Sequence, residues 1–185
     1  EIGKDEEHNA VIKERRNGQG AEVAGVTVEG KVAYLSLVQL QAGVTWQKSH
    51  YTRPEKWSKD SSVPAEKRIF RTPDWYGYFT ATYSPVKPLN IALSGTYTGS
   101  MIVQHMKGYI PKDIAVTTPD FFDMNLKISY DFSLYKFITL QLNAGIQNIF
   151  NAYQRDFDRG KERDSGYIYG PSMPRSYFAG AKLMF

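Results

Sequence analysis

The sequence predicts an all-β fold built of antiparallel strands, and three observations lead to this prediction. Apolar and polar residues alternate along seven separate stretches of the chain. A period of two is typical of strands that present two unlike faces. The links between these stretches are alternately short and long. No stretch shows the 3.6-residue period that would indicate a helix.

The chain opens with a charged segment that is followed by a hairpin. Residues 1–20 are rich in charge and are interpreted as a solvated loop, in which residues 10–13 form at most a strand end. Residues 22–33 alternate, and residues 38–48 alternate again. Because only residues 34–37 join the two stretches, we expect an antiparallel hairpin.

A second hairpin is predicted beyond a long loop. Residues 49–73 contain three prolines and no period, as is typical of a loop. Residues 75–84 and 89–98 alternate, and the sequence Pro-Val-Lys-Pro between them favours a tight turn. Residues 104–120 hold a glycine and two prolines and are predicted to be a second long link.

The third hairpin has the most regular alternation in the chain. Apolar residues occupy every second position of residues 123–132 and again of residues 138–147, with a short turn at residues 133–137. Residues 151–175 are rich in Asp, Arg, Gly and Tyr and are predicted to be a third long loop. Residues 176–185 form the last predicted strand.

The last predicted strand, residues 176–185, indicates that the fold is embedded in a membrane. One of its faces is apolar from end to end, and the chain stops on an aromatic residue. About ten alternating residues is the length of one tilted strand that crosses a bilayer. Short turns on one rim and long loops on the other are typical of outer-membrane β-barrels. Aromatic residues also stand near the ends of the apolar faces, as in interfacial girdles: Trp46, Trp75, Tyr83, Tyr97, Tyr130, Phe132, Tyr177 and Phe185.

The sequence therefore predicts antiparallel transmembrane β-barrel strands, with one alternative left open. A soluble β-sandwich or a lipocalin-like barrel also alternates, with its apolar residues turned inward. The polar face is made of Gln, Asn, Thr, Lys and Asp, which suits a wet lumen. Alternation alone does not separate these folds, whereas the lengths of the links and the aromatic girdles favour the membrane barrel.

Composition limits the possible functions. The chain has 185 residues, no cysteine, and a net charge of +4 from 23 basic and 19 acidic residues. Disulfides and thiolate metal sites are therefore impossible, and the charge is too balanced to indicate nucleic acid as a partner. No run of about 18 apolar residues is present that could form a transmembrane helix.

No catalytic constellation is present in the sequence, so we expect neither an enzyme nor a cofactor. The three histidines stand outside the strand centres, lack metal-ligand spacing and are interpreted as solvated: His8, His50 and His105. Four acidic residues of the third long loop could suggest a calcium loop, but they interleave with Arg and Lys and are interpreted as a solvated, charge-balanced loop: Asp156, Asp158, Glu162 and Asp164.

Two segments resemble motifs of TonB-dependent receptors. Residues 144–153, Ala-Gly-Ile-Gln-Asn-Ile-Phe-Asn-Ala-Tyr, are similar to the V-x-N-L-F-N-x-x-Y strand near the end of those receptors. Residues 170–185 resemble their closing P-x-x-P-R-x-Y-x-x-G-x-x-x-x-F sequence, and the two motifs stand in the family's order. The positions interpreted as a barrel-closing and assembly motif are Asn148, Phe150, Asn151, Pro174, Arg175, Tyr177 and Phe185.

The resemblance implies that residues 1–185 are the C-terminal segment of a receptor barrel of about 22 strands. No plug domain or TonB-box segment precedes the strands in the printed sequence. Seven antiparallel strands cannot close an ordinary bacterial barrel, and open edges in lipid would leave backbone groups unpaired. We therefore expect the remaining strands and the plug to lie elsewhere, in the same receptor or in another chain.

The resemblance also implies a function and partners. The complete protein would import a scarce nutrient, such as a siderophore, haem or cobalamin, through the outer membrane of a Gram-negative bacterium. Its expected partners are the plug, the TonB energy-coupling complex acting through the plug, outer-membrane lipid, and the barrel-assembly machinery, for which Phe185 would be an insertion signal. A passive porin or a purely structural barrel stays open as an alternative.

Overall fold

The computed structural model describes residues 3–5, 10–12, 18 and 20–185, and in this part of the chain all regular structure is β-strand. None of the described residues belongs to a helix long and apolar enough to cross a membrane. The strands are β1 (Gly3–Asp5), β2 (Ala10–Ile12), β3 (Ala21–Tyr34), β4 (Val38–Glu55), β5 (Glu66–Arg68), β6 (Trp75–Val86), β7 (Leu89–Thr98), β8 (Ile102–His105), β9 (Ile114–Thr117), β10 (Phe121–Tyr135), β11 (Ile138–Gln147) and β12 (Ser176–Met184).

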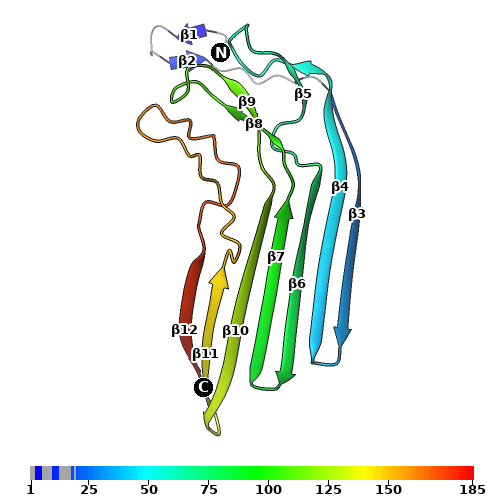
Figure 1. Cartoon of the computed structure of the whole chain (residues 1–185), viewed down its shortest axis with the longest axis vertical. Helices are drawn as coiled ribbons and strands as arrows, with labels where there is room; N and C mark the ends of the chain where they lie inside the picture. Colours follow the sequence, from blue (N-terminus) through cyan, green and yellow to red (C-terminus); the bar gives the residue numbers. More distant parts are fainter. Residues whose placement is uncertain (1–2, 6–9, 13–17, 19) are drawn as a thin grey trace.

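One antiparallel sheet dominates the structure (Figure 1). Its strands follow the order β12-β11-β10-β7-β6-β4-β3, and the short β5 pairs with β4 beside this path. Each long strand therefore pairs with its neighbours in sequence, as expected for successive hairpins. All seven predicted strands are confirmed, and β7 and β11 have the predicted bounds.

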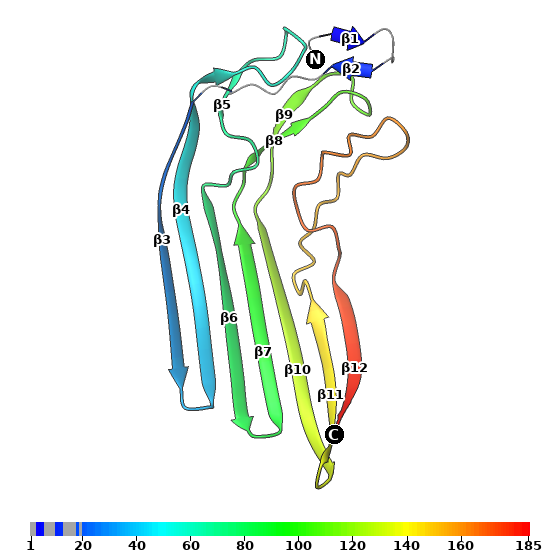
Figure 2. The ribbon, with the colours of Figure 1, turned by 180° about the vertical axis from the view of Figure 1, so that it is seen from behind.

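The sheet is an open, curved wall rather than a closed barrel, because β3 and β12 stand at its two edges. The turns β3–β4, β6–β7 and β10–β11 lie at one end of the wall, together with the C-terminus (Figures 1 and 2). The three long links lie at the opposite end. We call these ends the short-turn rim and the long-loop rim, and their separation confirms the predicted sorting of the links by length.

The long links contain more structure than the sequence predicts. Strand β4 continues from residue 48 to Glu55 because β3 pairs with it as far as Tyr51 and the short β5 pairs with it at Glu55. The link at residues 104–120 was predicted to be a loop, but β8 and β9 form a hairpin there that begins at Ile102. This hairpin is stable in a link because the Ile102 and Val103 side chains are buried.

The charged start of the chain was predicted to be a solvated loop. Within it the structure describes β1 and β2 as an antiparallel pair. Strand β2 lies where a strand end was expected, at residues 10–13, whereas β1 contradicts the prediction of a loop. Residues 18 and 20 are also described and are exposed. The rest of residues 1–20, including His8 and Lys13, lies outside the described residues.

The pairing register shows that the wall has one polar and one apolar face. Residues that lie opposite one another on neighbouring strands form a row across the sheet. One such row is polar throughout: Lys31, Gln41, Thr80, Ser94 and Asn125. The next row is apolar throughout: Val32, Leu40, Ala81, Leu93 and Leu126. The predicted alternation is therefore continuous from strand to strand.

Burial identifies the polar face as the more enclosed one. On this face Thr45 and Ser129 are only 8% and 9% exposed. Their neighbours on the apolar face, Val44 and Ile128, are 46% and 42% exposed. Because the two members of each comparison are adjacent in sequence, the difference comes from the face and not from the position along the strand.

The apolar face has the height of a membrane band. Its upper edge, toward the long-loop rim, carries Trp46 and Trp75, whose ring centroids are 6.4 Å apart. Its lower edge carries Tyr130 and Phe132, 4.6 Å apart. From Val38 to Trp46 the stripe spans about 26 Å at about 3.3 Å per residue. This length suits the apolar band of about 25 Å on transmembrane barrels.

The difference between the two faces predicts an asymmetric response to charge. Replacing Leu140 or Leu142 by Arg should destabilise the wall in a membrane by about 2–4 kcal/mol, because these side chains belong to the apolar face. Replacing Gln141 by Arg should cost little, since this residue lies on the polar face between them. Unfolding by urea in lipid vesicles measures both effects. Equal penalties for the three variants would show that both faces are packed.

Candidate functional site

The buried apolar residues of the described chain gather at the long-loop rim and not on the wall. Ile102 and Val103 of β8, Phe121 at the start of β10, and Tyr167 of the last long link are at most 7% exposed. The long links are therefore packed against one another. We call the part formed by residues 56–74, 99–120 and 148–175 the rim cap, and it contains most of the polar chemistry of the structure.

A buried contact between a histidine and a carboxylate joins two of the links. His105, at the end of β8, places its Nε2 atom 2.9 Å from Oδ2 of Asp158, and the two side chains are 8% and 2% exposed. The His105 ring also stacks on Tyr167 at a centroid distance of 3.7 Å and an interplanar angle of 7°. The amide of Asp164 donates to Oδ2 of Asp158 at 2.9 Å. The β8–β9 hairpin is thereby fixed to the last link.

A second polar cluster holds the last link in shape. The Tyr167 and Tyr169 hydroxyls donate to the two carboxylate oxygens of Asp156 at 2.8 and 2.6 Å. The side chain of Gln154 is fully buried. Its Nε2 donates to the Tyr167 carbonyl at 3.1 Å, and its Oε1 accepts from the Tyr169 amide at 2.9 Å. Gln154 therefore replaces the backbone pairing that this segment lacks.

Burial and hydrogen bonding within this cluster determine the protonation states of Asp156, Tyr167 and Tyr169. Burial raises the pKa of Tyr167, and the hydrogen bond to Asp156 raises it further. The same causes raise the pKa of Tyr169 to about 12. Burial acts to raise the pKa of Asp156, but the hydrogen bonds from Tyr169 and Tyr167 outweigh it, and the pKa lies below its usual value. At neutral pH two phenols therefore donate to one ionised carboxylate.

The first long link is tied to the other two. The guanidinium of Arg71 donates to the carbonyls of Ile168, at 2.7 Å, and of Gly166. The hydroxyl of Ser58 donates to Asp113 at 2.5 Å, and the other oxygen of this carboxylate accepts from the Lys107 amide at 2.7 Å. These bonds, that from Ser58 first, hold the pKa of Asp113 below its usual value. All three long links are thus joined in one polar network.

The network corrects two sequence-based predictions. His105 was predicted to be solvated, but it is buried against Asp158 and Tyr167. The acidic residues of residues 151–175 were predicted to balance neighbouring Arg and Lys, but Asp156 and Asp158 pair instead with tyrosines and a histidine. In the sequence, only the high Tyr and Asp content of residues 151–175 could have indicated this network. In the described part of the chain, no three His, Cys, Asp or Glu residues form a group that could hold a metal ion.

His50 differs from His105. It lies in β4, and its Nε2 is 3.4 Å from the Glu22 carboxylate of β3, with both side chains well exposed. The prediction of a solvated side chain therefore holds for His50. His8 lies outside the described residues.

Among the residues predicted to form a closing motif, Asn148 makes several hydrogen bonds across the last link. This residue follows β11, has a φ of 51° and is 4% exposed. Asn tolerates this left-handed conformation better than most residues. Its side chain donates to the carbonyls of Ala152 and Met173 at 3.1 and 2.9 Å and accepts from the Ala152 amide at 2.9 Å. Its own amide donates to Oδ1 of Asn125 at 2.9 Å.

Asn151 completes the junction between the last two strands. It has a φ of 54°, and its Oδ1 accepts from the Arg175 amide at 2.9 Å, just before β12 begins. The structure therefore brings Asn148, Asn151 and Arg175 together, with Pro174 in the same segment. This arrangement explains why two Asn residues stand at this spacing after a strand.

The other predicted motif residues lie apart from this junction. Phe150 stacks on Phe122, with ring centroids 5.6 Å apart, at the upper edge of the apolar face. Tyr177 and Phe185 belong to the edge of the sheet and are 71% and 91% exposed.

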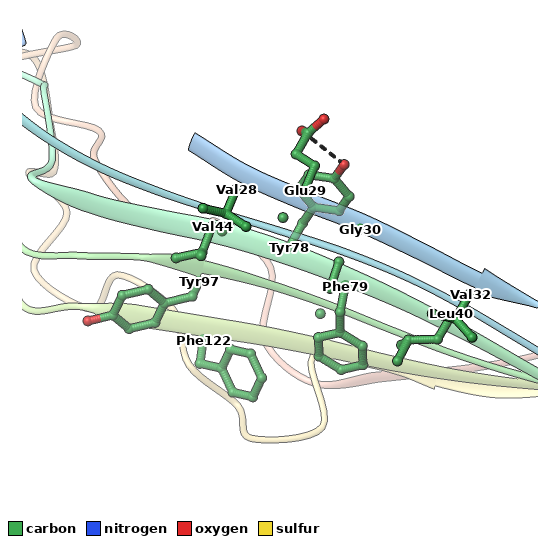
Figure 3. A pocket seen from close by; sticks show the side chains of 14 residues that line it. Val28, Glu29, Gly30, Val32, Leu40, Val44, Tyr78, Phe79, Tyr97 and Phe122 are labelled. Atoms are coloured by element: carbon green, nitrogen blue, oxygen red, sulfur yellow. Dashed lines mark hydrogen bonds between the residues drawn. The ribbon is translucent and has the colours of Figure 1, made fainter. Parts of the chain in front are cut away.

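The wall is hollowed on both faces. A hollow of about 560 Å³ lies on the apolar face and is lined by Val44, Phe79 and Tyr97 among others (Figure 3). Figure 3 also shows Tyr78 on the other side of the strands, where its hydroxyl donates to Glu29 at 3.2 Å. Two smaller hollows of about 370 and 260 Å³ lie on the polar face beneath the rim cap. Both are lined by Asp123 and Pro171.

The sequence matches no protein-family model and no curated protein. Solved structures do resemble it. The ferric-catecholate import receptor Fiu from E. coli K12, in its closed form, matches 89% of this chain with a TM-score of 0.60 and 21% identity. A chain of the FpvAI–pyocin S2 complex matches 89% with a TM-score of 0.59 and 15% identity.

These similarities show the fold. The chain covers 21% of the Fiu chain and 19% of the chain in the FpvAI complex, so it spans about a fifth of the length of either. The wall therefore has the fold of a segment of a TonB-dependent receptor barrel, as the closing motif predicted. The soluble sandwich and the lipocalin-like barrel are not favoured by these matches.

The junction at Asn148 gives a stability prediction. Replacing Asn148 by Ala in the full-length protein removes three side-chain hydrogen bonds and leaves a poorly suited residue at positive φ. At about 0.5–1.5 kcal/mol for each bond, the loss should be about 2–4 kcal/mol. Denaturant unfolding in detergent measures it. The matched control is Ser172→Ala in the same link, where the exposed side chain should matter little; a similar loss in both variants would contradict a special role for Asn148.

The Asp156 cluster gives a pH prediction. A carboxyl whose pKa is lowered on folding stabilises the fold above its unfolded pKa, which is about 4 for Asp. This contribution is lost as the pH falls through the lower folded value. The protection factors of the Tyr167 and Tyr169 amides, which compare their exchange rates with those of an unfolded peptide at the same pH, should therefore be high at neutral pH and fall below about pH 4. The variant Asp156→Asn should lose most of this pH dependence, and an unchanged profile would count against the cluster.

Proposed function

We propose that this chain is the C-terminal wall of an outer-membrane receptor that imports a scarce nutrient, such as a siderophore, haem or cobalamin. The main support is the match of 89% of the chain to the ferric-catecholate import receptor Fiu. The closing motif at Asn148 and Asn151 adds a second, independent likeness. A packed cap of loops at one rim gives the receptor a structured surface on which a nutrient can be bound.

The strand directions specify what completes the wall. Strand β3 runs into the turn at the short-turn rim, and β12 runs the same way because Met184 lies opposite Thr139. The two edges are therefore parallel to each other. A ring of copies of this chain would pair β12 with a parallel β3 at every seam, which is foreign to antiparallel barrels. The missing wall consequently contains an odd number of strands, and both of its edge strands run toward the long-loop rim.

Function would then divide between the two parts of the structure. In the proposed receptor the apolar face contacts outer-membrane lipid between its two aromatic rows, and the rim cap faces the cell exterior. A plug inside the complete barrel would receive energy from the TonB complex. Phe185, at the short-turn rim, would be recognised by the barrel-assembly machinery during insertion.

An uptake experiment tests the proposal. A strain that lacks the full-length gene, complemented with the gene or with an empty vector, is given labelled ferric catecholate, haem or cobalamin at low concentration. The complemented strain should accumulate one of these nutrients, and a protonophore should abolish the accumulation because import needs inner-membrane energy. Uptake that a protonophore leaves unchanged would indicate a passive porin, and the absence of all uptake would favour a structural barrel.

A further inference from the structure

The hollow on the apolar face of the wall has an uncovered floor. Gly30 of β3 and Ala42 of β4 lie opposite each other at its base. A Cβ atom added to Gly30 would meet no other atom within 4 Å. The Phe79 ring occupies the place that a Cβ atom of Gly95 would take, so it leans over β7 and away from β4. The space of about 560 Å³ beside it is therefore left open.

Apolar side chains form the walls of this hollow. Val28 and Val44 lie one row above the floor, toward the long-loop rim, and Val32 and Leu40 lie one row below it (Figure 3). These four residues are between 43% and 67% exposed. A contiguous apolar surface of this kind favours an apolar partner.

A cation lies above the hollow on the same face. Lys48 follows Trp46 by two residues in β4, so both side chains point outward, and Lys48 is exposed. Further toward the long-loop rim, two contacts occupy the charged side chains, His50 with Glu22 at 3.4 Å and Arg68 with Glu66 at 3.5 Å. Lys48 belongs to neither contact. From the rim downward, the face therefore presents an ammonium group, an indole and the apolar hollow.

This order is complementary to a phosphate-bearing lipid. An ammonium group binds phosphate, an indole suits the membrane interface, and an acyl chain is apolar. We infer that the wall binds lipid A, the phosphorylated glycolipid of the outer leaflet, with its phosphate at Lys48 and one acyl chain in the hollow. The inference rests on the proposed function, because it needs a wall that spans the outer membrane with the rim cap outside.

The position of the hollow fits one acyl chain. Half of the hydrocarbon core of a bilayer is about 15 Å thick, and four to five residues of strand cover this distance at about 3.3 Å each. An acyl chain that starts beside Trp46 and runs down β4 therefore ends between Ala42 and Leu40. These two residues line the floor and the lower wall of the hollow.

A second copy of the chain is a less suitable occupant. Two copies in one membrane are related by an axis along the membrane normal, so a symmetric contact brings residues of equal height together. Lys48 would then approach the partner's Lys48, and the like charges would repel each other. The phosphate of a lipid neutralises Lys48 instead.

The hollow is tested by filling it in the full-length protein. The protein is purified in detergent, freed of lipid and titrated with lipid A, and native mass spectrometry counts the bound lipid. Gly30→Leu should fold normally, because its Cβ atom meets no other atom. Its affinity for lipid A should fall about tenfold or more, the factor expected when two buried methylene groups are displaced. Ala144→Leu is the control, because it adds the same bulk to the apolar face on β11, outside the hollow, and should leave the affinity unchanged.

Removal of the charge provides the second measurement. Lys48→Gln should weaken the binding of lipid A about tenfold or more, the factor expected from the loss of a charged hydrogen bond. Dephosphorylated lipid A should bind the unmodified protein and Lys48→Gln equally, because the group that Lys48 contacts is absent. Lys87→Gln, in the turn between β6 and β7 at the short-turn rim, is the control and should leave the affinity unchanged.

Three results would overturn the inference. They are an affinity for lipid A that Gly30→Leu leaves unchanged, binding that depends on neither the phosphate nor Lys48, and a dimer that Gly30→Leu dissociates, which would make a second copy the occupant. Each can occur in a protein that still reaches the outer membrane and imports its nutrient, in which case the proposed function stands. Failure of the unmodified protein to form a membrane barrel would instead refute the proposed function.

Discussion

Backbone hydrogen bonding between antiparallel neighbours is the constraint on which this structure depends. Each long strand from β4 to β11 pairs with the long strand before it and the long strand after it in the chain. This local pairing allows tight turns at one rim and sets the register that keeps polar rows beside apolar rows. It also leaves the outward-facing backbone N–H and C=O groups of β3 and β12 without partners in the sheet. In a hydrocarbon environment such edges are very unfavourable, so the pairing that forms the wall also makes it incomplete.

The transition from the wall to the rim cap depends on side chains that form hydrogen bonds with main-chain groups in place of a neighbouring strand. After β11 the ladder ends, and Asn148 and Asn151 adopt positive φ and bond to main-chain groups of the final link. The Gln154 side chain also bonds to main-chain groups, those of Tyr167 and Tyr169. Amide side chains suit this task because each carries both a donor and an acceptor. The last strand can begin beside β11 after a long excursion because these bonds fix where the excursion returns.

The wall could be predicted from the sequence and the cap could not, for a physical reason. Alternation is a local signal, and Leu89–Thr98 and Ile138–Gln147 show it without interruption, so their bounds were predicted correctly. The cap depends on contacts between distant residues, such as His105 and Asp158, which are 53 positions apart. No local period marks such a pair. The motif positions Asn148 and Asn151 could be found by resemblance, but only the geometry shows that they bond to Met173 and Arg175.

The rim cap and the wall therefore differ in how much their structure depends on residues outside this chain. The described buried polar atoms of the cap are paired within this chain, so its shape depends little on the missing strands. The wall has open edges and, at Asp123, an unpaired oxygen in its polar face. A binding surface that is already ordered loses little conformational entropy when a ligand arrives. A wall whose two edge strands lack partners, in contrast, depends for its stability on strands that pair with β3 and β12. The order of the cap is thus set within this chain, whereas the order of the wall is set partly at its edges.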